Sequence, residues 1–336
     1  MEYRALGRSG LRVSEISLGS WLTYGRSVED DVARHCILRA YELGINLFDT
    51  ANAYNTGAAE ESLGRVVREL PRTDLVIATK VYFPMGKGPN DRGLGRKHVT
   101  EQCHASLRRL GVEYLDLYQC HRFDPEVPVD ETLRALEDLV QAGKVLYLGV
   151  SEWTGAQIRG AVETQERMGW HPLISNQPQY SMLVRTIEDE VIPASEECGV
   201  GQIVWSPLAQ GVLTGKYRAD APLPENTRAA DPTSNNFMEP LLQRPVLEAV
   251  DRLRPIADEL GISVAQLALA WVLRQPNVAS AIVGATRVEQ VETNAAASGV
   301  QLDSGILARI DEALEGAVRR EGTAPARGTR DEGKAS

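Results

Sequence analysis

The chain has 336 residues, of which 43% are apolar and 24% are charged, proportions typical of a globular protein and not of a disordered or fibrous one. It carries 46 Asp and Glu against 36 Lys and Arg, a net charge of −10 that phosphate backbones and anionic lipids would repel, so neither a nucleic acid nor a membrane is expected as a partner. No apolar run reaches the roughly 18–20 residues of a membrane helix, and Met1 to Gly10 contain no apolar signal segment, so we expect a cytoplasmic protein.

The four cysteines are widely spaced, at Cys36, Cys103, Cys120 and Cys198. They form no C-x-x-C pair and have no partner at metal-ligand spacing. We therefore expect neither a disulfide framework nor a bound metal, and we interpret the four side chains as buried, reduced thiols.

In chain order, two short extended segments, Tyr3–Leu6 and Arg12–Ser14, come first, and they predict a hairpin that caps one end of the fold. From there, apolar or β-branched runs alternate with segments of helical periodicity, several of which end at a glycine. The predicted strands are Ile16–Leu18, Asn46–Asp49, Leu75–Thr79, Leu115–Gln119, Val145–Val150, Leu173–Asn176, Gln202–Trp205 and Ala281–Val283. The predicted helices are Asp30–Leu43, Ala59–Glu69, Thr100–Leu110, Val129–Ala142, Thr154–Met168, Thr186–Cys198, Val246–Leu260, Val264–Leu273 and Ser304–Leu314.

Eight strand-then-helix units fit a closed parallel barrel better than an open sheet. An open doubly wound sheet would carry G-x-G-x-x-G after its first strand, but Ile16–Leu18 is followed by Gly19-Ser20-Trp21-Leu22. We therefore predict an α/β fold, a (β/α)8 TIM barrel that residues 1–316 form as a single domain, with the N-terminal hairpin as a cap and extra C-terminal helices outside.

Three segments do not follow the repeat. Residues 86–95 contain glycines, a proline and an asparagine, and we interpret them as a mobile loop over the barrel mouth. Arg218–Pro245 contains five prolines and no clear periodicity, and we interpret it as a lid over a cofactor or substrate. Residues 317–336 are rich in Gly, Ala, Arg and Glu and are predicted to be a disordered tail.

Polar residues follow three neighbouring strands, at the barrel end where active sites of this fold lie. Asp49 ends the second strand and precedes Tyr54, Lys80 follows the third, and His121 follows the fourth, so we expect these four side chains to converge. An ammonium stabilises a neighbouring phenolate and lowers the pKa of the phenol, while a carboxylate keeps the ammonium charged. Together with a histidine that orients a carbonyl oxygen, the set suits protonation of a developing oxyanion, as carbonyl reduction requires.

The segments around these residues resemble a known family. Phe48-Asp49-Thr50-Ala51-Asn52-Ala53-Tyr54 and Glu60-Glu61-Ser62-Leu63-Gly64 resemble the signature of the aldo-keto reductases. The resemblance extends through Ala78-Thr79-Lys80, Leu107–Leu117, Trp205-Ser206-Pro207-Leu208 and Gly284-Ala285-Thr286 and covers about residues 1–316. Gly211-Val212-Leu213-Thr214-Gly215-Lys216-Tyr217 resembles the branch that contains the potassium-channel beta subunits and related bacterial aldo-keto reductases.

This resemblance implies an NADPH-dependent oxidoreductase that reduces aldehydes or ketones to alcohols, with Tyr54 as general acid, Lys80 and Asp49 tuning it, and His121 orienting the substrate carbonyl. It implies a cofactor (NADPH/NADP+) that lies extended across the barrel mouth without a Rossmann unit. The implied cofactor residues are Ser151, Asn176 and Gln177 at the carboxamide, Trp205 on the nicotinamide ring, Ser206, Leu208, Gly211 and Thr214 at the pyrophosphate, Lys216 and Arg228 at the 2′-phosphate, and Gly284, Thr286, Arg287, Gln290 and Asn294 at the adenine end.

The sequence also departs from the family pattern. Glu152 stands where the channel-subunit branch usually has arginine, which puts a carboxylate near the cofactor, and Thr293 stands where many relatives have an acid. His121 replaces the asparagine of channel beta subunits and favours an enzyme. Aromatic residues after strand ends are candidates for the substrate pocket, with ordinary packing as the alternative for each: Trp21, Tyr24, Phe83, Phe123 and Trp153.

Two other functions are weighed against the reductase. A cofactor-sensing regulatory or binding module with slow turnover is the alternative that the channel-subunit resemblance allows. A carboxylate-based hydrolase would need paired acids at strand ends, where only Asp49 is clearly placed. The natural small-molecule carbonyl substrate is not indicated, and a homo-oligomer is left open.

Overall fold

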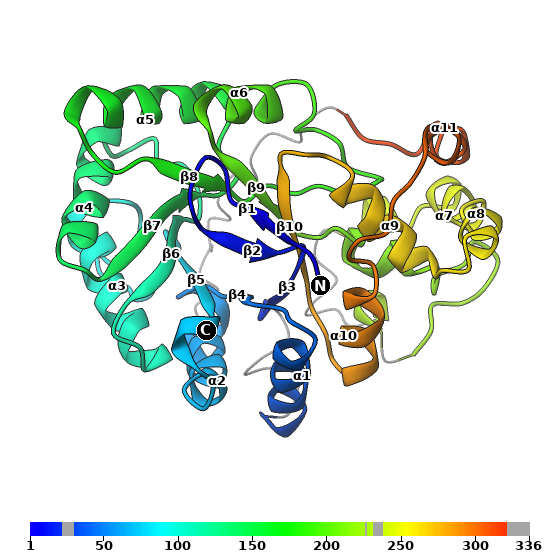
Figure 1. Cartoon of the computed structure of the whole chain (residues 1–336), viewed down its shortest axis with the longest axis horizontal. Helices are drawn as coiled ribbons and strands as arrows, with labels where there is room; N and C mark the ends of the chain where they lie inside the picture. Colours follow the sequence, from blue (N-terminus) through cyan, green and yellow to red (C-terminus); the bar gives the residue numbers. More distant parts are fainter. Residues whose placement is uncertain (22–29, 226, 231–237, 321–336) are drawn as a thin grey trace, which may run out of the picture.

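The computed structural model describes residues 1–21, 30–225, 227–230 and 238–320, in which eight parallel strands form a closed barrel (Figure 1). The strands follow the order β10-β3-β4-β5-β6-β7-β8-β9, so neighbours in the barrel are neighbours along the chain except where β10 closes onto β3. They are β3 (Ile16–Gly19), β4 (Leu47–Asp49), β5 (Val76–Val81), β6 (Leu115–Cys120), β7 (Val145–Val150), β8 (Leu173–Asn176), β9 (Gly201–Val204) and β10 (Val278–Val283). The predicted (β/α)8 barrel is confirmed.

Helices cover the outside of the barrel because the strands are apolar on that face too. Strands β5, β6 and β10 are buried at every residue, as parallel strands between an interior and a helix layer must be. The surrounding helices are α1 (Asp30–Glu42), α2 (Ala58–Val67), α3 (Arg96–Leu110), α4 (Val129–Gln141), α5 (Gly155–Met168), α6 (Val191–Cys198), α9 (Val264–Leu273) and α10 (Val288–Ala295). The extra helices α7 (Arg244–Asp251), α8 (Arg254–Glu259) and α11 (Ser304–Ala313) gather at one side in Figure 1.

Several helices differ in their bounds from the sequence prediction: α3, for example, begins at Arg96 and not at Thr100, and at two others a proline accounts for the difference. Helix α6 begins at Val191 and not at Thr186, which places Pro193 in its first turn, where a missing N–H group breaks no helical hydrogen bond. The segment predicted as one helix, Val246–Leu260, is divided between α7 and α8. Pro255 in an uninterrupted helix would clash with the carbonyl group four residues earlier, so the helix restarts with this proline in the first turn of α8.

The N-terminal hairpin closes the end of the barrel at which the strands begin. Strands β1 (Tyr3–Ala5) and β2 (Arg12–Ser14) pair antiparallel and lie across the barrel in Figure 1. Gly7 has a φ of +57°, and a Cβ atom there would lie 2.3 Å from the carbonyl oxygen of Gly199, just before β9. Only glycine fits this close approach, and the opposite end of the barrel is the open mouth.

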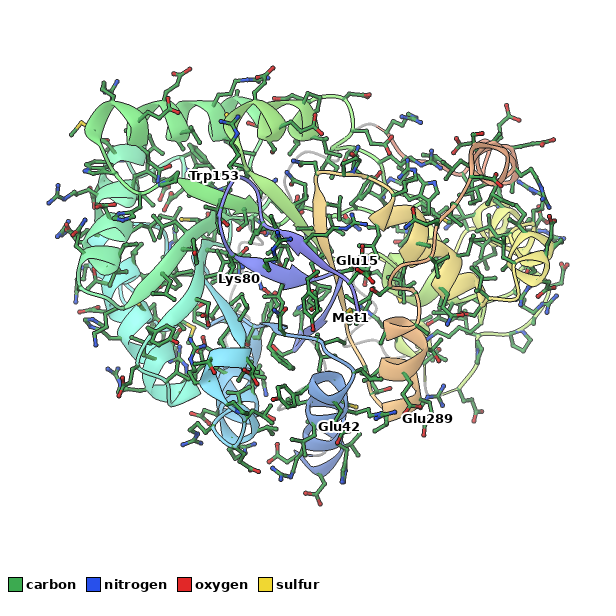
Figure 2. The ribbon with its side chains drawn as sticks, viewed as in Figure 1. Met1, Glu15, Glu42, Lys80, Trp153 and Glu289 are labelled. Carbon is green, nitrogen blue, oxygen red and sulfur yellow. The ribbon has the colours of Figure 1, made fainter. Side chains whose placement is uncertain are left out.

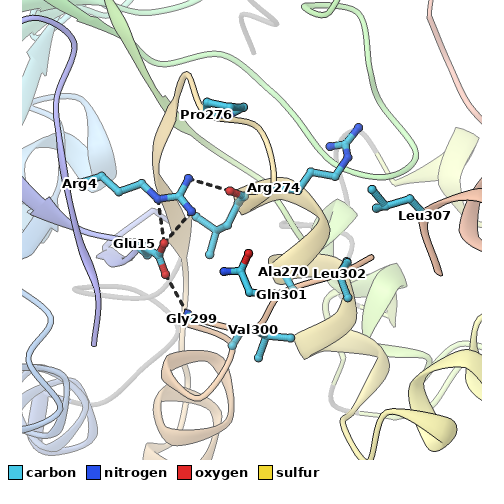
Figure 3. A pocket seen from close by; sticks show the side chains of 12 residues that line it. Arg4, Glu15, Ala270, Arg274, Pro276, Gly299, Val300, Gln301, Leu302 and Leu307 are labelled. Atoms are coloured by element: carbon cyan, nitrogen blue, oxygen red, sulfur yellow. Dashed lines mark hydrogen bonds and ion pairs between the residues drawn. The ribbon is translucent and has the colours of Figure 1, made fainter. Parts of the chain in front are cut away.

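A cavity of about 610 Å³ lies beside the hairpin, at the closed end (Figure 3). Its charged groups already have partners: the buried Glu15 carboxylate accepts hydrogen bonds from Arg4 Nε at 2.8 Å and from the Gly299 N–H group at 3.0 Å. Arg4 also donates to the carbonyl oxygen of Val278, where β10 begins. These contacts fasten the hairpin to the barrel, so we place the candidate active site at the mouth instead.

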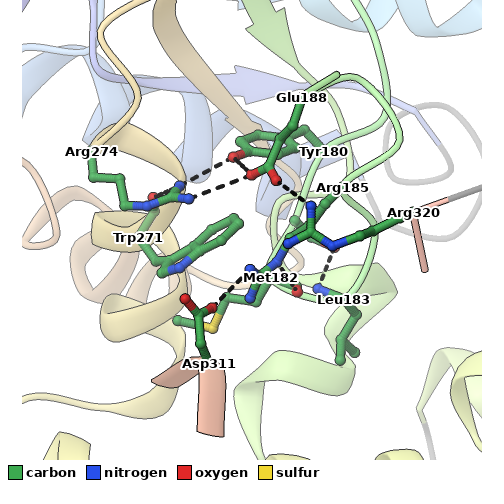
Figure 4. A network of polar contacts seen from close by, with 10 residues as sticks. Tyr180, Met182, Leu183, Arg185, Glu188, Trp271, Arg274, Asp311 and Arg320 are labelled. Atoms are coloured by element: carbon green, nitrogen blue, oxygen red, sulfur yellow. Dashed lines mark hydrogen bonds and ion pairs between the residues drawn. The ribbon is translucent and has the colours of Figure 1, made fainter. Parts of the chain in front are cut away.

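The end of the described chain is anchored to the barrel. Arg319 and Val184 form a parallel β-bridge, and Arg320 pairs with Glu188 at 3.2 Å in the polar network of Figure 4. Residues 317–320 therefore pack against the barrel, unlike the disordered tail expected to begin at residue 317, because backbone hydrogen bonds to the loop after β8 hold them. Residues 321–336 of that predicted tail lie outside the described residues.

The loops at the mouth are tied down by acidic side chains. In the loop after β5, predicted to be mobile, Asp91 accepts a hydrogen bond from the Gly88 N–H group at 2.8 Å, and Asp124 accepts one from the Leu94 N–H group at 2.8 Å. The predicted lid is described in part and contains two short 3-10 turns, η4 (Arg228–Ala230) and η5 (Glu239–Leu241).

The four cysteines are free thiols, three of them buried, whereas Cys198 is partly exposed. No single helix of the described ranges is long and apolar enough to cross a membrane, although the bent pair Arg244–Glu259 and Val264–Leu273 meets that length and composition test together.

Candidate active site

Lys80 is the centre of the predicted catalytic group. Strand alternation points Lys80 toward the barrel interior, and its ammonium group is fully buried there. It donates hydrogen bonds to Asp49 Oδ2 at 2.6 Å, to the Thr50 carbonyl oxygen at 2.8 Å and to the Tyr54 hydroxyl at 3.2 Å. The structure therefore brings Asp49, Tyr54 and Lys80 into direct contact, and an ammonium group with three donors has all three occupied.

Tyr54 begins the 3-10 turn η1 (Tyr54–Gly57), which follows β4. Burial raises the pKa of the Tyr54 phenol, and although Lys80 acts in the opposite direction, the net shift is upward. The buried site disfavours the charge of Lys80 as well, but Asp49 and Tyr54 outweigh this effect and hold the Lys80 pKa above its usual value. At neutral pH the site therefore holds a protonated phenol beside an ammonium–carboxylate pair.

His121 directly follows β6 and faces the same spot. Its ring packs edge-to-face on Tyr54, with ring centres 5.6 Å apart, and on Phe83, with ring centres 4.9 Å apart. Burial, with the positive charges of Lys80 and Arg122, holds the His121 pKa well below its usual value. The imidazole is thus neutral, and among the described residues its buried Nδ1 atom has no hydrogen-bond partner.

Of the residues implied at the nicotinamide carboxamide, Ser151 follows β7, Asn176 ends β8 and Gln177 follows β8. Gln177 donates through Nε2 to Asp49 Oδ1 at 2.9 Å, which joins this group to the catalytic one. Ser151 donates to the Gln177 carbonyl oxygen at 2.8 Å, and Asn176 donates to Gln202 at 3.1 Å. The buried Asn176 Oδ1 atom accepts no hydrogen bond within the described ranges, as expected for an acceptor that a bound amide would use.

Trp205 follows β9, and Glu152 fixes its orientation. The Trp205 indole N–H group donates to Glu152 Oε1 at 2.6 Å, and the Gln179 N–H group donates to the same oxygen at 2.7 Å. Glu152 reaches them from a left-handed backbone with a φ of +59°. The carboxylate that departs from the family pattern thus holds the aromatic ring implied to stack on nicotinamide, and Trp21 packs edge-to-face on that ring with centres 6.1 Å apart.

The loop after β9 forms a compact turn, the 3-10 element η3 (Ala209–Thr214). Its backbone turns left-handed at Ser206, Ala209, Gln210 and Gly211. Thr214 closes the turn by donating to the Gly211 carbonyl oxygen at 2.7 Å, and a Cβ atom on Gly211 would lie 3.2 Å from Lys216 Nζ. Leu208 packs partly buried against the core. An exposed ammonium group lies over a glycine turn, which is an arrangement suited to a phosphate.

Gln210 is a residue of this loop that the sequence analysis did not select. Its side chain is buried, and neither its oxygen nor its nitrogen has a hydrogen-bond partner among the residues described. A buried carboxamide with both polar atoms unpaired is costly unless a ligand supplies partners. The orphan atoms of Gln210 and Asn176, together with the Lys216 turn, fit a nicotinamide dinucleotide at the mouth.

Two further groups complete the implied cofactor path. Arg228 lies with its guanidinium carbon 4.8 Å from the centre of the Trp21 ring, and burial lowers its pKa to about 10. At the start of α10, the Thr286 N–H group and hydroxyl both donate to Gln290 Oε1. The other members of the adenine group are Gly284 and Arg287, which are exposed, and Asn294, which is buried.

The candidate pocket aromatics fall into separate groups. Phe83 packs on His121, and Trp21 packs on Trp205, so both touch the site. Phe123 and Trp153 pack edge-to-face with centres 5.0 Å apart, and Trp153 is only 2% exposed, as a core residue would be. Tyr24 lies outside the described residues.

A buried ion pair supports the site from behind and was missed by the sequence analysis. Lys80 faces inward, so its neighbour Thr79 faces the helices, where its hydroxyl donates to Glu60 Oε1 at 2.6 Å. Glu60 is fully buried and its other oxygen pairs with Arg109 Nε at 2.6 Å. This pair joins α2 and α3 to strand β5.

Comparisons with known proteins identify a family and several relatives. The model of the aldo/keto reductase family matches residues 15–315. A relative from Arabidopsis thaliana named as a probable voltage-gated potassium channel subunit beta is 42% identical over 325 residues, covering 95% of this chain and 98% of the relative. A rice (Oryza sativa subsp. japonica) protein of the same name is 42% identical over 88% of this chain and 90% of its own. A putative voltage-gated potassium channel subunit beta from Schizosaccharomyces pombe is 42% identical over 93% of each chain.

Within the described ranges no cluster of His, Cys, Asp and Glu is suited to hold a metal ion.

Proposed function

The chain belongs to the aldo/keto reductase family, whose members are oxidoreductases that use nicotinamide cofactors, and from this premise we propose that it reduces aldehydes or ketones with NADPH. Tyr54 is the proton donor in this proposal. The single observation that carries it is the contact of the Tyr54 hydroxyl, 3.2 Å from Lys80 Nζ, with an ammonium group that is itself bound to Asp49.

The geometry supports a defined role for each residue. When bound, NADPH supplies the hydride that the carbonyl carbon accepts. Tyr54, which burial keeps protonated, donates its proton to the carbonyl oxygen, and the adjacent charge of Lys80 stabilises the phenolate left behind. Neutral His121 packs on the Tyr54 ring, where its imidazole can orient the same oxygen.

NADPH, and not NADH, is proposed on account of the cations along the implied cofactor path. Lys216 is exposed at the Gly211 turn, and the Arg228 guanidinium lies at Trp21. A 2′-phosphate gains charge-assisted hydrogen bonds from such cations that the 2′-hydroxyl group of NADH does not gain.

The proposal is tested with the purified protein, NADPH and a panel of aldehydes, by following NADPH oxidation. Tyr54→Phe should lower kcat by about 10²–10⁴-fold, the range of general acid catalysis, while the Kd for NADPH stays unchanged. Tyr41→Phe is the matched control, because it removes a hydroxyl group from the surface helix α1. Normal turnover by Tyr54→Phe with intact cofactor binding would refute the role of Tyr54.

A second candidate function comes from the names of the relatives, which are potassium channel beta subunits. In this alternative the chain binds a channel-like partner and senses the redox state of its cofactor, with slow turnover. His121, in place of the asparagine of channel beta subunits, favours the enzyme. Turnover within the usual range of enzymes, about 1–10³ per second, would contradict the alternative.

A further inference from the structure

Arg122 lies beside the candidate active site, and among the described residues it has no counter-ion. It follows His121 in the loop after β6, at the mouth of the barrel, and is partly buried. Its Nη1 atom donates to the His121 carbonyl oxygen at 2.6 Å, and its guanidinium carbon lies 5.6 Å from the centre of the Phe83 ring. No acidic side chain of the described residues forms an ion pair with it.

These contacts place the guanidinium beside the aromatic side chains that pack on the candidate site. The Arg122 guanidinium lies near the Phe83 ring, the Phe83 ring packs on His121, and His121 packs on Tyr54. This row of aromatic rings connects Arg122 to the proposed proton donor. Its positive charge acts to lower the pKa values of Tyr54 and His121, although burial keeps the pKa of Tyr54 above its usual value, so the guanidinium is close enough to act on both groups.

The two acids that follow Arg122 in the same loop, Asp124 and Glu126, form no ion pair with it among the described contacts. Asp124 is buried and its two carboxylate oxygens accept hydrogen bonds from the N–H groups of Leu94 and Glu126. Glu126 is exposed. One N–H group of Arg122 donates to the backbone of His121, and its Nε and Nη2 atoms have no partner among the residues that the structure describes. That edge of the guanidinium can donate two parallel hydrogen bonds to a single carboxylate.

We propose that Arg122 is a specificity-determining residue that gives this reductase a preference for carbonyl compounds bearing a carboxylate group. The inference rests on the proposed function and names the substrate class of the same site. The guanidinium binds the carboxylate of the substrate while the carbonyl group lies against His121 and Tyr54. Phe83 then contacts the part of the substrate between these two groups. In a chain with a net charge of −10, this local cation offsets the overall repulsion of an anionic substrate.

The test compares two benzaldehydes that differ in charge, 4-carboxybenzaldehyde and methyl 4-formylbenzoate, together with the corresponding 3-substituted pair. We expect Arg122→Gln to lower the ratio of kcat/KM for the acid to that for its ester by about 10- to 100-fold, mainly through KM. Comparing the same ratio between variants cancels the intrinsic reactivities of the two aldehydes. Arg122→Lys keeps the charge but loses the paired donors, so its ratio should fall between those of Gln and wild type.

Arg92→Gln is the matched control. It removes an exposed cation from the neighbouring loop and should leave the ratio unchanged. Raising the ionic strength should lower the wild-type preference for the acid. Thermal unfolding of each variant establishes that it is folded.

The outcomes separate this inference from the proposed function. An unchanged ratio in Arg122→Gln, or an equal fall for acid and ester through kcat, would overturn the specificity role, and the second result would assign Arg122 to holding His121. If the wild type reduces the esters with NADPH and shows no dependence on Arg122, the reductase stands and this inference fails. If it reduces no carbonyl compound, both fail.

Discussion

Replacing Arg109 with alanine should destabilise the fold by about 3–5 kcal/mol, although Arg109 lies outside the active site. Its guanidinium pairs with Glu60, whose side chain is fully buried, whereas 18% of the Arg109 side chain is exposed. Removal of Arg109 leaves a carboxylate with no counter-charge in the helix layer, and only the Thr79 hydroxyl and any water that enters can solvate it. At about 2.1 cal/mol/K per residue for 336 residues, this cost corresponds to a fall in Tm of about 4–7 °C.

The measurement is urea unfolding at 25 °C with thermal unfolding beside it. Arg108→Ala is the matched control, because Arg108 is the exposed neighbour on the same helix, and its loss should cost less than about 0.5 kcal/mol. Adding Glu60→Gln to Arg109→Ala should recover part of the loss by removing the stranded charge. If Arg109→Ala costs no more than Arg108→Ala, the pair is not the support that its burial indicates, and the reasoning fails.

Three further outcomes are expected. Burial holds the pKa of Tyr54 above its usual value and that of His121 well below its own, so the proposed proton donor stays protonated and the imidazole stays neutral. The kcat/KM for reduction should therefore be flat from about pH 6 to 9 and fall only as pH rises through the Tyr54 pKa. A change in kcat/KM centred near pH 7 would contradict this. In the folded protein, Cys198 should react first with an aromatic disulfide reagent, and the three buried thiols only after denaturation; several fast thiols would contradict the burial. Glu152→Ala should weaken cofactor binding more than Glu152→Gln, because the Gln variant keeps an acceptor for the Trp205 indole N–H group. Equal increases in the cofactor Kd of the two variants would show that only the charge of Glu152 matters.

The barrel was predictable because its strands are short apolar runs between strong helix signals. The strands β7 and β8 have the bounds that the sequence predicts, because their β-branched runs and the flanking turn residues define where each strand begins and ends. The prediction failed where a proline within a periodic segment was passed over. Proline has no N–H group to donate within a helix, so it is tolerated only in the first turn. Applying this rule to Pro193 and Pro255 would have placed both helix starts near these residues.

The contacts within the candidate catalytic group were predictable for a different reason, which is that the strand ends of a parallel barrel meet at one mouth. Strand order and alternation alone bring Asp49 and Lys80 together. The Glu152 contact to Trp205 was not predictable, because it depends on a left-handed backbone that glutamate rarely adopts and no local pattern specifies. Glu60 was quoted only as part of a motif, since a buried acid and an exposed one look alike until the partner helix is placed.

If Tyr54 is the proton donor, as we propose, its buried site must meet two opposing requirements. A proton donor must keep its proton before the reaction, and burial ensures this by raising the pKa of the phenol. The same burial would make loss of that proton prohibitively costly if nothing received the charge. Lys80 resolves the conflict because its ammonium group, held by Asp49 and the Thr50 carbonyl oxygen, already touches the Tyr54 hydroxyl before any charge develops there. The stabilisation therefore requires little reorganisation at the moment of transfer, which is the form of electrostatic assistance that a buried site makes most effective.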